Sequence, residues 1–175
     1  MMIVQGLLVA LVFYVISLLS LSWCANPMLD RPIVLGPLVG LVLGDLQQGI
    51  LLGASIELIF LGVASIGPSM PANAGLGGTI ATAFVILTGA EMEVALALAV
   101  PIGLLGVFTF ELQKLITASF LPMFDRFAET GNTKGYDHAI LWVSALVYCF
   151  QASLVFLCIA FGTHSIDVLL AAIPA

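Results

Sequence analysis

Long apolar runs separated by short polar or Pro/Gly-rich breaks organise the whole chain. Residues 3–25 and 139–162 are apolar runs that can cross a bilayer as helices, since a helix rises about 1.5 Å per residue and the hydrocarbon core is about 30 Å thick. Residues 1–22 contain no Lys or Arg, so we interpret the first run as a retained membrane helix rather than a signal peptide.

Shorter apolar runs fill the middle of the chain. Residues 33–46 would reach only about 21 Å as a helix, which is too short to cross a membrane. Two further runs, at 49–66 and 74–90, flank a breaker-rich segment at 67–73 that cannot be regular helix. Apolar segments that are short and interrupted by Gly and Pro are typical of re-entrant or broken helices, which line binding sites in transporters.

The pattern in the second half of the chain predicts two helices joined by a hydrophilic connector. Another apolar run begins at Val94, and Pro101 and Gly103 are expected to kink it. We therefore predict one membrane domain with an all-α polytopic fold that contains transmembrane helices and re-entrant elements. Its parts are a first helix and turn (1–32), a Gly-rich substrate-binding region (33–90), a helix (91–121), a hydrophilic connector (122–138) with a turn at 131–133, and a helix with a tail (139–175).

Composition supports a location in the bilayer. Apolar residues make up 62% of the chain, charged residues 8%, and the mean hydropathy is +1.23, whereas soluble domains contain about 25% charged residues. The net charge of −6 argues against nucleic acid as a partner. The 122–138 connector carries two of the four cations, so the positive-inside rule favours the cytoplasmic side for it.

Two acids stand alone in the apolar middle of the chain. Asp45 and Glu57 are the only charged residues between positions 33 and 90. A carboxylate facing lipid costs about 2.5–3.5 kcal/mol on insertion scales, so both are expected to face protein or a watery cavity. A polar binding site inside the membrane is the leading interpretation. The alternative for Asp45 is that it caps a helix end or lies at the interface.

Glycines repeat at helical spacing on both sides of Asp45. Gly36, Gly40 and Gly44 lie four residues apart, and Gly49, Gly53 and Glu57 repeat that spacing. Small residues at positions i and i+4 allow two helix backbones to approach closely. The pattern therefore predicts close packing here, with Glu57 on the glycine face and away from lipid.

Further polar groups favour binding over catalysis. Asn73, Ser69 and Gln151 lie in or beside apolar runs, and amides and hydroxyls can pair with the hydroxyls of a sugar. Ser69 has the alternative role of satisfying local backbone, and Gln151 that of joining two helices. The sequence contains no nucleotide-binding loop, no arrangement of a nucleophile, and no spacing of Cys or His that fits a metal, so no catalytic residue, metal or cofactor is expected.

The segment around the two acids resembles a known family. Arg31-Pro32, the run Leu38-Val39-Gly40-Leu41-Val42-Leu43-Gly44-Asp45, Gly49-Ile50, Glu57-Leu58 and the later Pro71-Ala72-Asn73 are similar in order and spacing to the enzyme IIC component of mannose-type sugar phosphotransferase systems. The resemblance extends through Ala99-Val100-Pro101 and Phe150-Gln151-Ala152. Residues 34–44 look most like members for N-acetylgalactosamine and related sugars.

The resemblance implies a transport role in the bacterial cytoplasmic membrane. A IIC subunit pairs with a IID membrane subunit, in trimers of IIC–IID units, and the two bind and translocate a sugar. A IIB subunit, charged by IIA, then phosphorylates the sugar. The resemblance assigns the sugar site first to Glu57 and Asn73, then to Asp45 and Ser69. It also implies that the membrane segments following the position of Pro174 in the family are lacking here.

Two other functions remain open from the residues alone. A secondary transporter coupled to protons or cations could use Asp45 and Glu57 as titrating carboxylates. A structural subunit, or an inactive truncated relative, would only pack against other helices.

Overall fold

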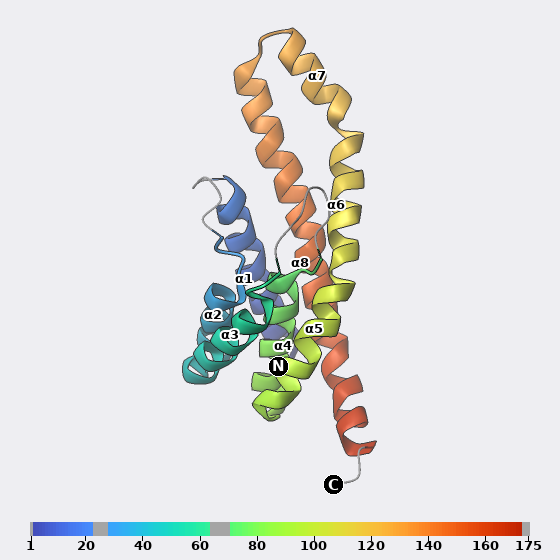
Figure 1. The fold of residues 1–175 in the computed structure, drawn as a ribbon. Helices are drawn as coiled ribbons and strands as arrows, with labels where there is room; N and C mark the ends of the chain where they lie inside the picture. Colours follow the sequence, from blue (N-terminus) through green and yellow to red (C-terminus); the bar gives the residue numbers. More distant parts are fainter. Residues whose placement is uncertain (1, 23–27, 64–70, 173–175) are drawn as a thin grey trace.

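The predicted all-α fold is confirmed. The computed structural model describes residues 2–22, 28–63 and 71–172, and these form eight α-helices without a strand (Figure 1). The helices are α1 (Met2–Ser22), α2 (Pro32–Leu43), α3 (Leu46–Phe60), α4 (Ala74–Thr88), α5 (Met92–Leu105), α6 (Val107–Ser119), α7 (Leu121–Glu129) and α8 (Thr133–Ala172).

The fold combines membrane-length apolar stretches with shorter apolar helices. Within the described residues, three stretches are long and apolar enough to cross a membrane: Met2–Ser20, Met92–Ser119 and Thr133–Gly162. The helices α2, α3 and α4 have 12, 15 and 15 residues, which corresponds to about 18–23 Å of axial length. Each of these three is therefore shorter than the hydrocarbon core of a bilayer, as expected for the re-entrant region.

The helices α2 and α3 form a hairpin in which their backbones touch. A Cβ added at Gly36 would lie 2.6 Å from the Cα of Gly53, and one added at Gly49 would lie 2.7 Å from the Cα of Gly40. The predicted close approach of the two glycine faces is thus confirmed for these four positions. Gly44 differs, because it ends α2 in the left-handed conformation with φ +94° and has nothing near its Cβ position.

The helix α4 lies at the centre of the fold. Residues 74–85 are all buried, because two apolar clusters pack on different sides of the helix. One cluster joins α4 to α1, α2 and α8 through Leu76, Ile80 and Phe84. The other joins α4 to α3 and α5 through Ala74, Ala81 and Val85. The short helices are thereby held between longer ones that can face lipid.

The second half of the chain extends away from this core as a long arm. The fifth apolar run is divided into α5 and α6 at Gly106, and Pro101 and Gly103, where a kink was expected, lie within α5. The expected 122–138 connector is largely helical, because it contains most of α7 and the first residues of α8, which begins at Thr133. Gly131, with φ +64°, lies in the predicted turn between these two helices. Figure 1 shows α6 and α7 rising beside the upper half of α8, which then returns through the core. The helix α8 continues to Ala172, where a short tail was expected.

Candidate functional site

Glu57 is buried in the core of the fold and ion-paired. Its residue is 8% exposed, and it continues the face of α3 that carries Gly49 and Gly53 toward α2. The guanidinium of Arg31 donates to Oε1 of Glu57 from Nη2 and, at 2.8 Å, from Nε. The backbone N–H of Ile33 donates to Oε2 at 3.3 Å. The carboxylate is therefore shielded by protein, as the sequence predicted for Glu57.

Helix ends create this arrangement. Arg31 precedes Pro32, which starts α2, and the first N–H groups of a helix have no partner within the helix. A carboxylate placed there satisfies such a donor and interacts favourably with the positive end of the helix dipole. Arg31 also donates to the carbonyl of Phe60, at the C-terminal end of α3, at 3.4 Å. The ion pair thus ties the start of α2 to the end of α3.

Arg31 is a site residue that the sequence reasoning missed. It was noted only as part of the Arg31-Pro32 motif, yet it is the sole Lys or Arg among the first 113 residues. A carboxylate in an apolar tract needs a counter-ion, and Arg31 is the one Lys or Arg in this part of the sequence. This shortage of cations was the signal that could have paired Arg31 with Glu57.

The pair retains hydrogen-bonding capacity. A guanidinium has five N–H donors and a carboxylate about four acceptor positions. Within the described part of the chain, the two N–H groups on Nη1 of Arg31 have no hydrogen-bond partner. The side chain of Arg31 is 27% exposed and that of Glu57 is 11% exposed. Arg31, which supplies the hydrogen-bond donors, is therefore the more solvent-accessible residue of the pair.

Asn73 is buried at the start of α4. Its Oδ1 accepts from the N–H of Leu76 at 3.0 Å, which caps the helix, and its Nδ2 donates to Oγ1 of Thr109 at 3.3 Å. The residue is 6% exposed. Asn73 is thus held by the surrounding helices, and one N–H of its amide has no hydrogen-bond partner among the described residues.

The ion pair and Asn73 lie in one region of the fold. The carbonyl of Asp30 packs against the Cα of Gly75, and the ring of Pro32 packs against Gly78, where an added Cβ would lie 2.9 Å from the Cβ of Pro32. Residues 30–32 therefore lie over the first turns of α4, next to Asn73. The start of α2, the end of α3 and the start of α4 converge there.

Asp45 does not join this region. It is exposed, and its carboxylate accepts from the N–H of Gln48 at 2.9 Å as the N-cap of α3. Twelve residues of sequence separate it from Glu57, or about 18 Å along the helix. The structure matches the alternative interpretation of Asp45, in which this acid caps a helix end.

Replacing Asp45 with alanine is expected to destabilise the hairpin modestly. Loss of an N-cap side chain costs about 1 kcal/mol, and the exposed carboxylate has no other partner among the described residues. Thermal unfolding of the purified protein in detergent measures the effect. The Asp45→Asn variant, which retains a capping oxygen, is the control and should remain near the original value.

Gln151 and Ser69 complete the predicted set. Gln151 is 2% exposed on α8, and its Nε2 donates to Oε1 of Gln113 on α6 at 3.1 Å. This contact matches the alternative in which Gln151 joins two helices. Ser69 lies outside the described residues.

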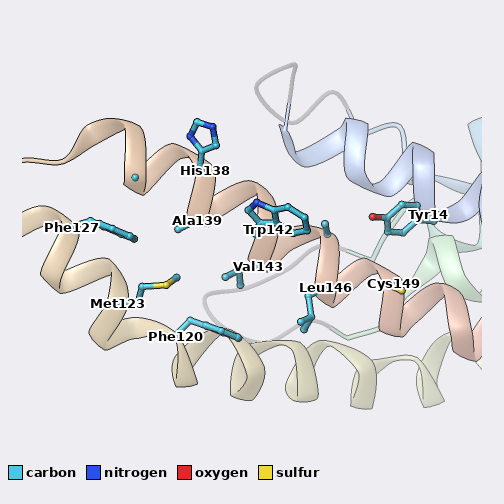
Figure 2. A pocket seen from close by; sticks show the side chains of 12 residues that line it. Tyr14, Phe120, Met123, Phe127, His138, Ala139, Trp142, Val143, Leu146 and Cys149 are labelled. Carbon is cyan, nitrogen blue, oxygen red and sulfur yellow. The ribbon is translucent and has the colours of Figure 1, made fainter.

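An apolar groove of the described structure lies away from this region. A groove of about 750 Å³ lies between the arm helices and opens toward α1. Figure 2 shows Phe120, Met123 and Phe127 on one side of it and Trp142 and Leu146 on α8, with Tyr14 farther along. Its lining is almost entirely apolar and contains no carboxylate, so its chemistry does not suit a polyhydroxylated ligand.

Membrane-length helices that surround short paired helices and a partly buried ion pair define an all-α membrane protein as the class of protein. The chain belongs to the family described as sorbose-specific IIC components of the phosphotransferase system, whose model matches residues 3–175.

Individual relatives agree with this assignment. A putative N-acetylgalactosamine permease IIC component 2 of Escherichia coli is 45% identical over 95 residues, which are 54% of this chain and 67% of that protein. The mannose-specific EIIC component of Escherichia coli is 32% identical over 149 residues, which are 82% of this chain and 54% of that protein. The chain spans about half to two thirds of the length of these two relatives.

Solved structures show the same fold. The structure of the mannose transporter ManYZ in complex with a microcin aligns with a TM-score of 0.75 at 30% identity, covering 98% of this chain and 68% of that one. A structure described as a membrane protein aligns with a TM-score of 0.79 at 31% identity, covering 98% and 69%.

Proposed function

We propose that this chain is the sugar-binding and translocating IIC subunit of a PEP-dependent phosphotransferase system. Family membership supports the class, and the observation that carries the site is the partly buried Arg31–Glu57 pair beside the start of α4. A charged pair with unused donors in an apolar fold matches the needs of a ligand rich in hydroxyl groups.

The site is centred on three residues. Arg31 offers N–H donors on Nη1, Glu57 offers remaining acceptor capacity on Oε2, and Asn73 offers an amide N–H. Asp45 and Gln151 hold helices in place instead, and Ser69 remains a proposal from the family resemblance alone. The substrate is a hexose or an N-acetylated amino sugar, in line with the mannose, fructose, sorbose and N-acetylgalactosamine named for the relatives.

The protein works with other subunits in this proposal. A IID membrane subunit completes the translocation unit, as the ManYZ relative supports, and such units assemble as trimers in the cytoplasmic membrane of a bacterium. A cytoplasmic IIB subunit, charged by IIA, transfers the phosphoryl group to the sugar. The chain itself crosses the membrane several times.

The ion-coupled alternative draws less support from the geometry. It requires Asp45 and Glu57 to titrate as transport groups, yet Asp45 is an exposed helix cap and Glu57 is paired with Arg31. The two acids do not share a site. A purely structural role would use the Arg31–Glu57 pair only to join α2 to α3, whereas the transport proposal also uses the Nη1 donors of Arg31.

Replacing Glu57 with glutamine is expected to abolish sugar uptake by the complete transporter. The amide cannot hold the guanidinium as strongly as a carboxylate does, and it loses the charged acceptor. Uptake is measured in cells that express the complete protein, with its IID, IIA and IIB partners, in a host without its own mannose-type system. Affinity for mannose and N-acetylgalactosamine is measured by calorimetry on the purified membrane complex.

The matched control is Glu111→Gln. Glu111 lies on α6, is exposed, and pairs with Lys114 at 2.7 Å, so this variant removes an ion pair away from the site and should transport normally. An assembled Glu57→Gln complex that binds sugar with unchanged affinity would refute the site assignment. Uptake driven by an imposed ion gradient without the phosphoryl cascade would favour the ion-coupled alternative.

A further inference from the structure

Asn73 contacts both sides of the break between α5 and α6. Its backbone N–H donates to the carbonyl of Gly103 on α5 at 2.8 Å, and its side-chain Nδ2 donates to Thr109 on α6. Gly106, at the break itself, is so close that an added Cβ would lie 2.7 Å from the Cβ of Asn73. One residue at the start of α4 therefore holds the junction between the core and the long arm.

Two partners fix the orientation of the Asn73 amide, namely the N–H of Leu76 on its oxygen and the hydroxyl of Thr109 on its nitrogen. The hydroxyl of Thr109 donates to the carbonyl of Gly106 at 2.6 Å, and a hydroxyl has a single hydrogen. Its oxygen must therefore accept from Asn73, which agrees with Nδ2 facing Thr109 and Oδ1 facing the N–H of Leu76. Thr109 and Asn73 are 8% and 6% exposed, so water competes little for these bonds.

The orientation of the amide determines which hydrogen-bond donor and acceptor remain for a ligand. With one N–H used by Thr109 and one lone pair of Oδ1 used by Leu76, the amide retains one donor and one acceptor in fixed directions. Without the Thr109 hydroxyl, the amide N–H that now donates to it would lose its hydrogen-bond partner. The N–H of Leu76 would then be the only remaining partner of the side chain among the described residues. Preorganised polar groups bind ligands with less ordering cost.

We propose that Thr109 is a positioning residue for the sugar site, which acts through Asn73 and joins that site to the α5–α6 break. This inference rests on the proposed function, because it presumes that Asn73 contacts the sugar. Thr109 itself need not touch the ligand. The sugar affinity of the transporter should then depend on a hydroxyl located on the far side of Asn73.

The test compares Thr109→Val with Thr109→Ser in the complete membrane complex. Valine retains the shape of threonine without the hydroxyl, whereas serine retains the hydroxyl. Calorimetry with mannose and with N-acetylgalactosamine gives the affinity, and thermal unfolding gives the stability. Loss of one positioned hydrogen bond is expected to weaken sugar binding by roughly 3- to 10-fold in the valine variant, and the serine variant should remain within about twofold of the original.

Two further measurements separate positioning from a general structural effect. The Thr117→Val variant, which changes an exposed threonine on the same helix, should leave sugar affinity unchanged. In the background of Asn73→Ala, the Thr109→Val substitution should cause no additional loss of affinity, because its route to the ligand is gone. If the valine variant does not assemble, Thr109→Ala adds no bulk and gives the same readouts.

Each outcome decides a separate question. Unchanged affinity in Thr109→Val, or an equal further loss in the Asn73→Ala background, would overturn the positioning role while the sugar-transport function stands. An equal loss in the serine and valine variants would also overturn it, because the hydroxyl would then not matter. Absence of binding of either sugar to the original complex, together with absence of uptake, would instead reject the proposed function.

Discussion

A single methyl group added at Gly49 is expected to separate the two helices of the α2–α3 hairpin. In the Gly49→Ala variant the new Cβ would lie 2.6 Å from the carbonyl oxygen of Gly36 and 2.7 Å from the Cα of Gly40. Both neighbours are backbone atoms, which cannot rotate away as a side chain can. The helices must therefore move apart, and the ion pair at the end of the hairpin must move with them.

Two opposing effects set the size of this result. Alanine in place of glycine stabilises an isolated helix by about 0.5–1 kcal/mol, whereas forcing extra volume into a packed contact costs about 1–3 kcal/mol. The clash is expected to dominate, with the unfolding temperature in detergent lowered by up to about 10 °C. Sugar binding should weaken as well, because the spacing between Arg31 and Glu57 depends on the same contact.

Gly6→Ala is the matched control. Gly6 is also a buried helical glycine, but a Cβ there would lie 3.5 Å from the side chain of Ile159, which is an ordinary van der Waals distance. This variant should be as stable as the original or slightly more stable. If Gly49→Ala were equally stable, the close backbone contact would not be what holds the hairpin.

Much of the fold could be predicted because the membrane simplifies the problem. Backbone groups in hydrocarbon must pair within a helix, so the apolar runs located α1, α2 and α4 to within a few residues. Most of α7 and the start of α8 lie in the segment that was expected to be a hydrophilic connector. The repeat of Gly36 and Gly40 with Gly49 and Gly53 likewise predicted the backbone contact between α2 and α3. Apolar runs and glycine spacing can be recognised from neighbouring residues alone, without knowing which distant residues they contact.

The missed features depend on contacts between distant parts of the chain. Glu57 was expected to be buried, but its partner Arg31 lies 26 residues away in the sequence. The link from Asn73 to Thr109 spans 36 residues and has no local pattern. The boundary between α5 and α6 lies at Gly106, where the chain packs closely against Asn73, and no local pattern in the sequence indicates that contact. Each required the helices to be placed in space first.

Neutralising Arg31 is expected to damage the protein more than neutralising Glu57. Arg31→Gln leaves a carboxylate with an 11% exposed side chain without its cation, whereas Glu57→Gln leaves a guanidinium that is 27% exposed and can be partly solvated. Removing one member of a buried pair costs about 3–5 kcal/mol, and partial exposure reduces this to about 2–4 kcal/mol for Arg31→Gln. The ranking follows from which charge is left behind in the more buried position.

The double variant Arg31→Gln with Glu57→Gln completes the comparison. It buries no unpaired charge, so it should be less destabilised than Arg31→Gln alone, and the non-additivity measured by thermal unfolding is the coupling within the pair. Sugar binding should behave differently, because both charged groups are then absent from the site, and it should not recover along with stability. Stability changes that simply add would mean that the two side chains are not coupled. Recovery of sugar affinity in the double variant would show that the pair only supports the fold and does not contact the ligand.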